Sequence, residues 1–438
     1  MKYLITLLML CLGVHMSANS VKDPILFYQI NGVKIPVIYE ESSLLPIGSI
    51  QLVFIGGGSV NDGEKFGLSR LGASILNEGT KELGATKFSE KLEQKAIGLS
   101  ASSGLETLNI TLDYLKDKQK DAISLLGDLL SSPNLTENAL KNIQTKTISN
   151  LLNKETDFDY IASTTLSSLL FKNTPLAHPA LGTIQSVKNI ELKDIKTYLK
   201  ENLSLSRLII VMGGDIDTDK TLATLKPILS KLPTGQKAKT HHYNANAKPQ
   251  EKIILKDTQQ AYIYFGAPFA INSLKDEAYK AKVMGFILGS SGFGSRLMEE
   301  IREKRGLAYS AYMRIVTANI ASYATGYLQT QLKNQNESIK LVKKVVADFI
   351  DKGVTQAELD NAKKFLLGSE PLRNETLSAR LGAKFYNFYL GLPLDFDKIE
   401  LEQIKNLTLK EFNGYVKSHP EIKNLSFSIV TKKEEKGK

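Results

Sequence analysis

Cysteine, histidine and tryptophan are scarce in this sequence. Its 438 residues include no tryptophan, one cysteine and five histidines. The one cysteine, Cys11, lies in an apolar run near the N-terminus, so a chain that loses this run has no thiol. Disulfide bonds and cysteine nucleophiles are thereby excluded from the mature protein. No serine-centred G-x-S-x-G elbow with a plausible histidine partner is present either, which argues against a serine hydrolase.

The few histidines do not have the spacing of a metal site. Four lie beyond residue 20, namely His178, His241, His242 and His419, and no two of them stand four positions apart. A helical pair of zinc ligands needs that spacing. Adjacent residues of an extended segment point to opposite sides, so His241 and His242 are expected to be polar linker residues. The sequence therefore predicts no metal site in this chain.

Charge of one sign is not concentrated anywhere along the chain. The formal net charge is +10, but the 56 Lys and Arg residues are scattered among 46 acidic ones. Nucleic-acid binding favours a basic stripe with interleaved aromatic residues, and none is visible. We therefore expect no nucleic-acid partner.

Residues 1–20 have the pattern of a signal peptide. Lys2 precedes an apolar run from Leu4 to Val14, and Ser17 and Ala18 follow it. The run is too short to span a bilayer, which takes about 20 residues. We expect an exported protein, periplasmic in a Gram-negative bacterium, with an uncleaved anchor as the alternative. A lipoprotein is not indicated, because Leu10 stands before Cys11 where a small residue is expected.

The chain is long enough for two domains, and a polar segment divides it. Residues 233–250 are polar, lack apolar periodicity and have proline at both ends, as an interdomain linker does. We expect an N-terminal domain over 21–232 and a C-terminal domain over 251–438.

The two halves show the same order of strands and helices. In the first half, apolar patterns predict strands at 49–55, 104–115 and 206–217 and helices at 67–77, 121–130 and 136–171. In the second half they predict strands at 259–268, 310–332 and 424–432 and helices at 276–306, 335–352, 355–391 and 408–418. This order favours an α+β fold of two homologous α/β sandwich domains, each a mostly antiparallel sheet covered by helices.

The segment EKFGLSRLGASILNEGT, residues 64–80, carries a family resemblance. It resembles the inverted zinc motif of the pitrilysin or insulinase type of zinc peptidases, the inverzincins, at about the same distance into the mature chain. The positions that match the frame of the motif are Gly67, Leu68, Leu76, Gly79 and Thr80.

The catalytic positions of the motif H-x-x-E-H do not match. In the family, the two His hold zinc and the Glu activates water. Here Arg70, Ala73 and Ser74 stand in those places, and Asn150 stands where the resemblance puts the third ligand, a Glu. Arginine repels zinc, alanine cannot accept a proton and serine is a poor ligand. The resemblance thus implies a degenerate zinc motif.

The second half keeps a different part of the family pattern. Its segment 289–312 resembles the C-terminal signature, in which an Arg and a Tyr seven positions apart donate hydrogen bonds to the substrate carbonyl and the developing oxyanion. Arg302 and Tyr309 have this spacing, and the match extends over Ser295, Arg296, Leu297, Gly306, Leu307 and Ala308. The alternative is a surface arginine paired with Glu299 or Glu303, and a half-buried Tyr309.

Two further segments have counterparts in the family. The resemblance implies a flexible loop near bound peptide, with Gly289, Gly292 and Gly294 as candidates, like the Gly-rich loop in the non-catalytic alpha subunit of the mitochondrial processing peptidase. Residues 97–104 match the edge strand to which relatives add substrate as a further strand.

The resemblance covers residues 25–430 and implies two domains that face each other as a clamshell. It implies a non-catalytic subunit of a two-chain zinc peptidase, with no cofactor in this chain and zinc in a partner that carries H-x-x-E-H. Peptides would be the substrates, and pairing of the chain with itself stays open. The alternative is an inert scaffold or peptide-binding protein, comparable to the core proteins of respiratory cytochrome complexes.

Overall fold

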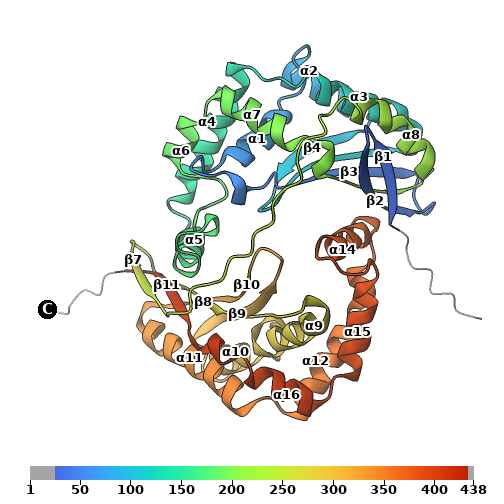
Figure 1. The fold of residues 1–438 in the computed structure, drawn as a ribbon. Helices are drawn as coiled ribbons and strands as arrows, with labels where there is room; N and C mark the ends of the chain where they lie inside the picture. The colour runs from blue at the N-terminus through green and yellow to red at the C-terminus, as the bar shows by residue number, and fades with distance from the viewer. Residues whose placement is uncertain (1–24, 433–438) are drawn as a thin grey trace, which may run out of the picture.

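Two lobes, each built from one β-sheet with helices on its outer side, face each other in the structure (Figure 1). The structure is a computed structural model and describes residues 25–432. The predicted signal peptide, residues 1–20, lies outside the described residues. Each lobe combines a mixed sheet with helices, which confirms the predicted α+β class.

The first lobe is centred on a six-stranded sheet in the order β1-β2-β6-β3-β5-β4. Only β2 and β6 run parallel among its neighbouring strands. Ile50, Leu52 and Phe54 of β3 are fully buried in the core shared with the outer helices, whereas Ser49 and Gln51 line a cavity on the opposite face. The strands are β1 (Leu26–Ile30), β2 (Val33–Glu41), β3 (Ile47–Ile55), β4 (Gly98–Ser103), β5 (Thr107–Leu115) and β6 (Leu208–Gly214).

Amphipathic helices cover the outer face of this sheet. In α1, Leu71, Ile75 and Leu76 recur at helical spacing and are buried, as the sequence pattern predicts. The helices of the first half of the chain are α1 (Leu68–Leu76), α2 (Gly84–Glu93), α3 (Gln119–Ser131), α4 (Glu137–Lys154), α5 (Phe158–Leu170), α6 (Ile184–Asn189), α7 (Leu192–Asn202) and α8 (Thr218–Leu229).

The second lobe is centred on a five-stranded sheet in the order β7-β11-β8-β10-β9. Only β7 and β11 run parallel among its neighbouring strands. Strand β9 lies at one edge, and its register with β10 shifts near its first residues. The strands are β7 (Glu251–Leu255), β8 (Gln260–Pro268), β9 (Ala308–Thr317), β10 (Ser322–Gln331) and β11 (Ser426–Thr431).

The helices of the second half include two π-helical turns, Phe286–Ser290 and Glu299–Glu303, on either side of a glycine-rich loop. Such turns occur frequently at functional sites. The α-helices are α9 (Leu274–Gly285), α10 (Arg296–Met298), α11 (Gln335–Lys352), α12 (Gln356–Gly368), α13 (Glu370–Arg373), α14 (Leu377–Tyr389), α15 (Phe396–Asn406) and α16 (Leu409–Lys417). No helix within residues 25–432 is both long and apolar enough to cross a membrane.

Each lobe contributes one helix to the inner face of the other lobe's sheet (Figure 1). Helix α5 of the first half packs on β8 and β11, and its Leu166 and Leu170 belong to an apolar cluster between the lobes. Helix α14 of the second half packs on β2 and β6, where Leu381 clusters with Ile38 and Val53. Burial of these leucines holds the two lobes together.

Charged side chains reinforce the contact of α14 with the first sheet. Nε of Arg380 lies 2.6 Å from one carboxylate oxygen of Glu40 on β2, and Nζ of Lys384 lies 3.2 Å from the other. All three side chains are at most 27% exposed, so these pairs are screened less than surface ones.

The segment 233–250 has no helix or strand and passes between the lobes (Figure 1). Near its start, the Ser206 amide donates to the Thr234 carbonyl oxygen at 2.9 Å. Further on, the Tyr243 amide donates to the carbonyl oxygen of Ile320, in the turn between β9 and β10, at 2.8 Å. The segment is therefore held by both lobes.

Residues 355–391 differ from the expected helical stretch. They form three helices, α12, α13 and α14. Pro371, in the first turn of α13, lacks an amide hydrogen and cannot continue the hydrogen bonding of α12, and Thr376 caps the start of α14. The predicted elements also omit strands β1, β2 and β7 and helices α2, α6, α7, α8 and α15, which the structure contains.

Candidate functional site

A buried aspartate lies just before the degenerate zinc motif. Asp62 accepts hydrogen bonds from the amides of Gly67 at 3.0 Å and Ser69 at 2.9 Å, and so caps the start of α1. Gly67 has φ +94°, a conformation that other residues rarely adopt. Burial raises the pKa of Asp62 to about 6, although these hydrogen bonds and the charge of Arg70 act in the opposite direction. The turn is therefore built around a carboxyl group that sequence reasoning did not single out.

The motif positions themselves do not fit a zinc ion. On α1, Ala73 is buried, and Arg70 and Ser74 are half-buried, with Nε of Arg70 buried and without a hydrogen-bond partner. Asn150, at the expected third position, lies on α4 and is exposed. Guanidinium and methyl groups supply no lone pair for a metal. Within residues 25–432, no group of three or more His, Cys, Asp or Glu is placed to hold a metal ion.

The C-terminal end of α1 is hydrogen-bonded to the edge strand β4. The side-chain amide of Asn77 donates to the Ala101 carbonyl oxygen at 2.9 Å, and its oxygen accepts from the Ala101 amide at 2.8 Å. Ala101 lies on β4, the terminal strand of the first sheet, where residues 97–104 were expected to form an edge. This paired contact positions the strand against the helix that carries the altered motif.

The four histidines are dispersed over the described chain. His178 stacks on Phe66, His241 lies beside Tyr243, Nδ1 of His242 lies 2.8 Å from the Asn319 carbonyl oxygen, and His419 stacks on Phe269. These contacts give each histidine a structural neighbour, and they agree with the interpretation of His241 and His242 as linker residues.

In the second lobe, Arg302 and Tyr309 lie together, and a third residue joins them. The guanidinium carbon of Arg302 lies 4.4 Å from the centre of the Tyr309 ring and 4.6 Å from the centre of the Phe293 ring. Arg302 belongs to the second π-helical turn, Tyr309 to the start of edge strand β9, and Phe293 to the glycine-rich loop. Sequence reasoning missed Phe293, whose only signal is its place between Gly292 and Gly294.

The surroundings of this pair argue against the interpretation of Arg302 as part of a surface ion pair. Glu299 pairs with Lys304 at 2.8 Å, and within residues 25–432 neither Glu299 nor Glu303 forms an ion pair with Arg302. Tyr309 is 81% exposed and therefore does not fill the core. The sequence-based alternative for both residues is wrong in these respects.

Arg296, six residues before Arg302, has a structural role, because its guanidinium is held by hydrogen bonds. Its Nε and Nη2 donate to the two carboxylate oxygens of Glu358 at 2.6 and 2.9 Å, and Nη2 also donates to the Gly353 carbonyl oxygen at 2.7 Å. This bidentate pair ties α10 to α12. In the part of the chain that the structure describes, Arg302 has no such partner, which separates the roles of the two arginines.

The three glycines proposed for a substrate loop occupy two different environments. Gly289 is buried, and a Cβ atom there would lie 2.4 Å from the Met313 backbone nitrogen, so it allows close packing of the π-helical turn on β9. Gly292 and Gly294 have φ of +69° and +85° in open space. Only the latter two belong to the loop that carries Phe293.

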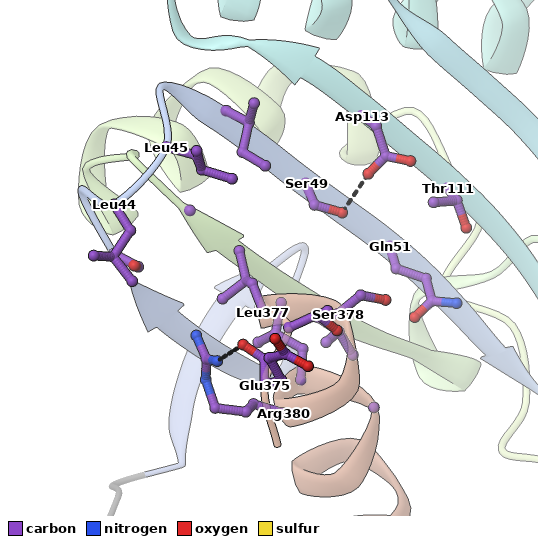
Figure 2. Close-up of a pocket in the computed structure, with 17 residues that line it drawn as sticks. Leu44, Leu45, Ser49, Gln51, Thr111, Asp113, Glu375, Leu377, Ser378 and Arg380 are labelled. Carbon is purple, nitrogen blue, oxygen red and sulfur yellow. Dashed lines mark hydrogen bonds between the residues drawn. The ribbon is translucent and has the colours of Figure 1, made fainter. Parts of the chain in front are cut away.

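A cavity of about 700 Å³ lies between the inner face of the first sheet and the start of α14 (Figure 2). Ser49 and Asp113 line one wall, where the Ser49 hydroxyl donates to the Asp113 carboxylate at 2.6 Å. Leu44 and Leu45 lie at one end and are 85% and 60% exposed, and Glu375 lies on the α14 side. This volume falls in the range of about 300–1,000 Å³ that is typical of ligand pockets.

Two family models match consecutive parts of the chain. The model described as Insulinase (Peptidase family M16) matches residues 37–184, and the one described as Peptidase M16 inactive domain matches residues 189–366. The first match includes the altered zinc motif, and the second includes Arg302 and Tyr309.

Relatives and solved structures agree with these matches. A protein of Helicobacter pylori named non-peptidase homolog YmxG is 51% identical over 432 residues, which are 99% of each chain. An uncharacterized zinc protease YmxG of Bacillus subtilis is 24% identical over 83% of this chain and 88% of its own. The crystal structure of a peptidase M16 inactive domain from Pseudomonas fluorescens superposes with a TM-score of 0.85 at 24% identity, over 94% of this chain and 98% of that one. The chain therefore belongs to peptidase family M16, as the sequence resemblance predicts, and its altered motif cannot bind zinc or activate water.

Proposed function

We propose that this chain is the zinc-free half of a two-chain M16 peptidase. It supplies Arg302, Tyr309 and one half of the peptide chamber, and a partner chain that carries H-x-x-E-H supplies the zinc ion, the glutamate base and the other half. Peptides are the substrates.

One observation carries this proposal. The zinc-motif part of the family's active site is altered in this chain, whereas the Arg and Tyr part is present. The motif positions Arg70, Ala73 and Ser74 have lost every zinc-binding and proton-accepting group. Arg302, by contrast, has no ion-pair partner within residues 25–432, and Tyr309 beside it is largely exposed. An inert scaffold does not need a guanidinium that is free of ion pairs. A shared active site needs one, because the free N–H groups can bind the substrate.

The chemistry of the two side chains supports this assignment. A guanidinium and a phenol are hydrogen-bond donors that do not ordinarily titrate near neutral pH. Such donors stabilise a substrate carbonyl and the negative charge that develops on its oxygen when water attacks. Zinc and the glutamate base in the partner would supply the attacking water.

The name of the Helicobacter pylori relative, non-peptidase homolog, supports the absence of independent activity. We propose accordingly that the chain alone cleaves no peptide. The cavity beside Ser49 and Asp113 lies between the inner face of the first sheet and α14 and supports a contribution to the peptide chamber.

Reconstitution tests the proposal. The purified chain is expected to bind no stoichiometric zinc and cleave no peptide, and addition of the H-x-x-E-H protein encoded nearest to it is expected to produce cleavage. Arg302→Ala and Tyr309→Phe should reduce this cleavage, whereas Arg305→Ala, at an exposed arginine paired with Glu300, should not. Full activity of the Arg302 and Tyr309 variants would favour the scaffold alternative.

The cellular location is a further part of the proposal. The apolar run Leu4–Val14 supports export to the periplasm of a Gram-negative bacterium. Cell fractionation, with N-terminal sequencing of the mature protein, tests it: an intact N-terminus in the cytoplasm would contradict export.

A further inference from the structure

We infer that Phe293 is a positioning residue for Arg302: its ring and that of Tyr309 hold the guanidinium between them and present its N–H edge to an oxygen of an extended peptide. This inference rests on the proposed function, since it assigns the substrate-facing role to Arg302, and it adds a residue from the glycine-rich loop.

The geometry is that of two cation–π contacts to one cation. The guanidinium carbon of Arg302 lies 4.6 Å from the Phe293 ring centre and 4.4 Å from the Tyr309 ring centre. Both distances are within the range of about 6 Å in which a ring attracts a cation. The rings come from segments nine residues before and seven residues after Arg302, so the contact is made by the fold and not by one helical turn.

The rings are the anchors that the described chain provides for this side chain. Among residues 25–432, no carboxylate pairs with Arg302, and the nearby Glu299 and Glu300 pair with Lys304 and Arg305. Guanidinium N–H groups lie in the plane of the group, so a guanidinium that stacks on a ring through its face keeps them free, and within the described residues the Arg302 side chain donates no hydrogen bond. The donors of Arg302 therefore remain available for a ligand oxygen.

The loop that carries Phe293 is fixed at its C-terminal side. The Ser295 hydroxyl donates to the Gly292 carbonyl oxygen at 2.8 Å, and the Ser295 amide donates to the same oxygen at 3.1 Å. Ser295 also accepts from the Met298 amide and caps α10. These bonds close a turn over residues 292–295 and hold the Phe293 ring beside Arg302.

The exposure of the two rings agrees with a positioning role. Phe293 is 67% exposed and Tyr309 is 81% exposed, so neither ring is placed there by burial in the core. An exposed cation–π contact changes an equilibrium by about 2- to 5-fold. Loss of the Phe293 ring should therefore loosen Arg302 without unfolding the lobe.

The test separates the position of Arg302 from its function. In the full chain with ¹⁵N-labelled arginine, the Arg302 Nε–H resonance should be shifted by the currents of the two rings. Phe293→Leu should move it toward the position of a free arginine, and Phe293→Tyr should retain it. Phe365→Leu, at a phenylalanine of α12 that is 54% exposed, serves as the control and should leave it unchanged. An unmoved resonance in Phe293→Leu overturns the inference.

Activity of the reconstituted two-chain complex provides the second measurement. Phe293→Leu should lower kcat/KM by about 2- to 5-fold, and it should have no further effect in an Arg302→Ala background, because the two residues act through one contact. An additive loss would overturn the positioning role. If the resonance moves while Arg302→Ala retains full activity, the proposed function fails and the positioning of Arg302 by Phe293 stands.

Discussion

The phenol of Tyr389, at the end of α14, donates a hydrogen bond of 2.5 Å to the carboxylate of Glu106, in the turn between β4 and β5. The two residues are 283 positions apart and belong to different lobes. Burial raises the pKa of Glu106, and the bond from Tyr389 acts against that rise. One hydrogen bond thus links the attachment of α14 to the ionisation of a carboxyl group in the first lobe.

Tyr389→Phe should lower the free energy of unfolding by about 1–3 kcal/mol, because it leaves the Glu106 carboxylate without its donor. Urea denaturation monitored by circular dichroism measures this change. Tyr312→Phe is the matched control, since the Tyr312 hydroxyl makes no hydrogen bond within the described chain.

The loss in Tyr389→Phe should also depend on pH. A carboxyl group whose folded pKa lies above its ordinary value contributes stability below the unfolded pKa and loses that contribution as pH rises through the folded pKa. Without Tyr389, the pKa of Glu106 rises further, so the destabilisation should be larger near about pH 8 than near about pH 4. An equal loss at both pH values would contradict this role of Glu106.

Leu381→Ala should destabilise the protein by about 2–5 kcal/mol, because Leu381 is 5% exposed and packs α14 on the first sheet. Leu372→Ala, at a residue of α13 that is 74% exposed, should change stability by no more than about 0.5 kcal/mol. Thermal unfolding of both variants checks the difference. Similar melting temperatures for the two would show that α14 does not hold the lobes together.

Asp62→Asn should flatten the pH dependence of stability between about pH 4 and about pH 6. Asp62 has an ordinary pKa of 3.8 that rises to about 6 in the folded chain. Its contribution is therefore present below pH 3.8 and lost as pH rises through about 6. Denaturation series across this window, with wild type and variant side by side, measure the slope, and identical slopes would contradict the pKa assigned to Asp62.

Substitution of the three motif residues by His, Glu and His should not give this chain peptidase activity. The variant R70H/A73E/S74H has two histidines at zinc spacing, but Asn150 on α4 is exposed and is not a carboxylate. We expect weak zinc binding and no cleavage by this chain alone. Isothermal titration with zinc, alongside a peptide assay, checks both, and tight binding with activity would show that the third position was misassigned.

Some helices and strands could be predicted from the sequence because the apolar pattern that predicts each of them lies within one short segment. The apolar spacing of Leu71 and Ile75 predicted α1, and the short apolar run at 49–55 predicted β3. Strands β1 and β7 were missed because each is five residues long and only partly buried. Strand β2 and helix α15 were missed as well, although they are longer. Helices α2, α6, α7 and α8 of the first half were also not predicted.

The arrangement between distant segments could not be predicted in this way. The apolar faces of α5 and α14 indicate burial, but periodicity does not reveal that each covers the other lobe's sheet. The spacing of Arg302 and Tyr309 came from the family pattern, whereas the contact of Phe293 with Arg302 depends on the path of the loop at Gly292 and Gly294. Such a contact has no signature in the sequence.

The central claim is that Arg302 works in an active site whose zinc belongs to another chain. The most direct measurement is peptide cleavage and zinc content for this chain, an H-x-x-E-H partner and their mixture, each with wild-type chain and with Arg302→Ala. The account predicts zinc only in the partner, cleavage only in the mixture, and a loss of about 10²- to 10³-fold with Arg302→Ala. Cleavage by this chain alone, or an unchanged rate with Arg302→Ala, would contradict it.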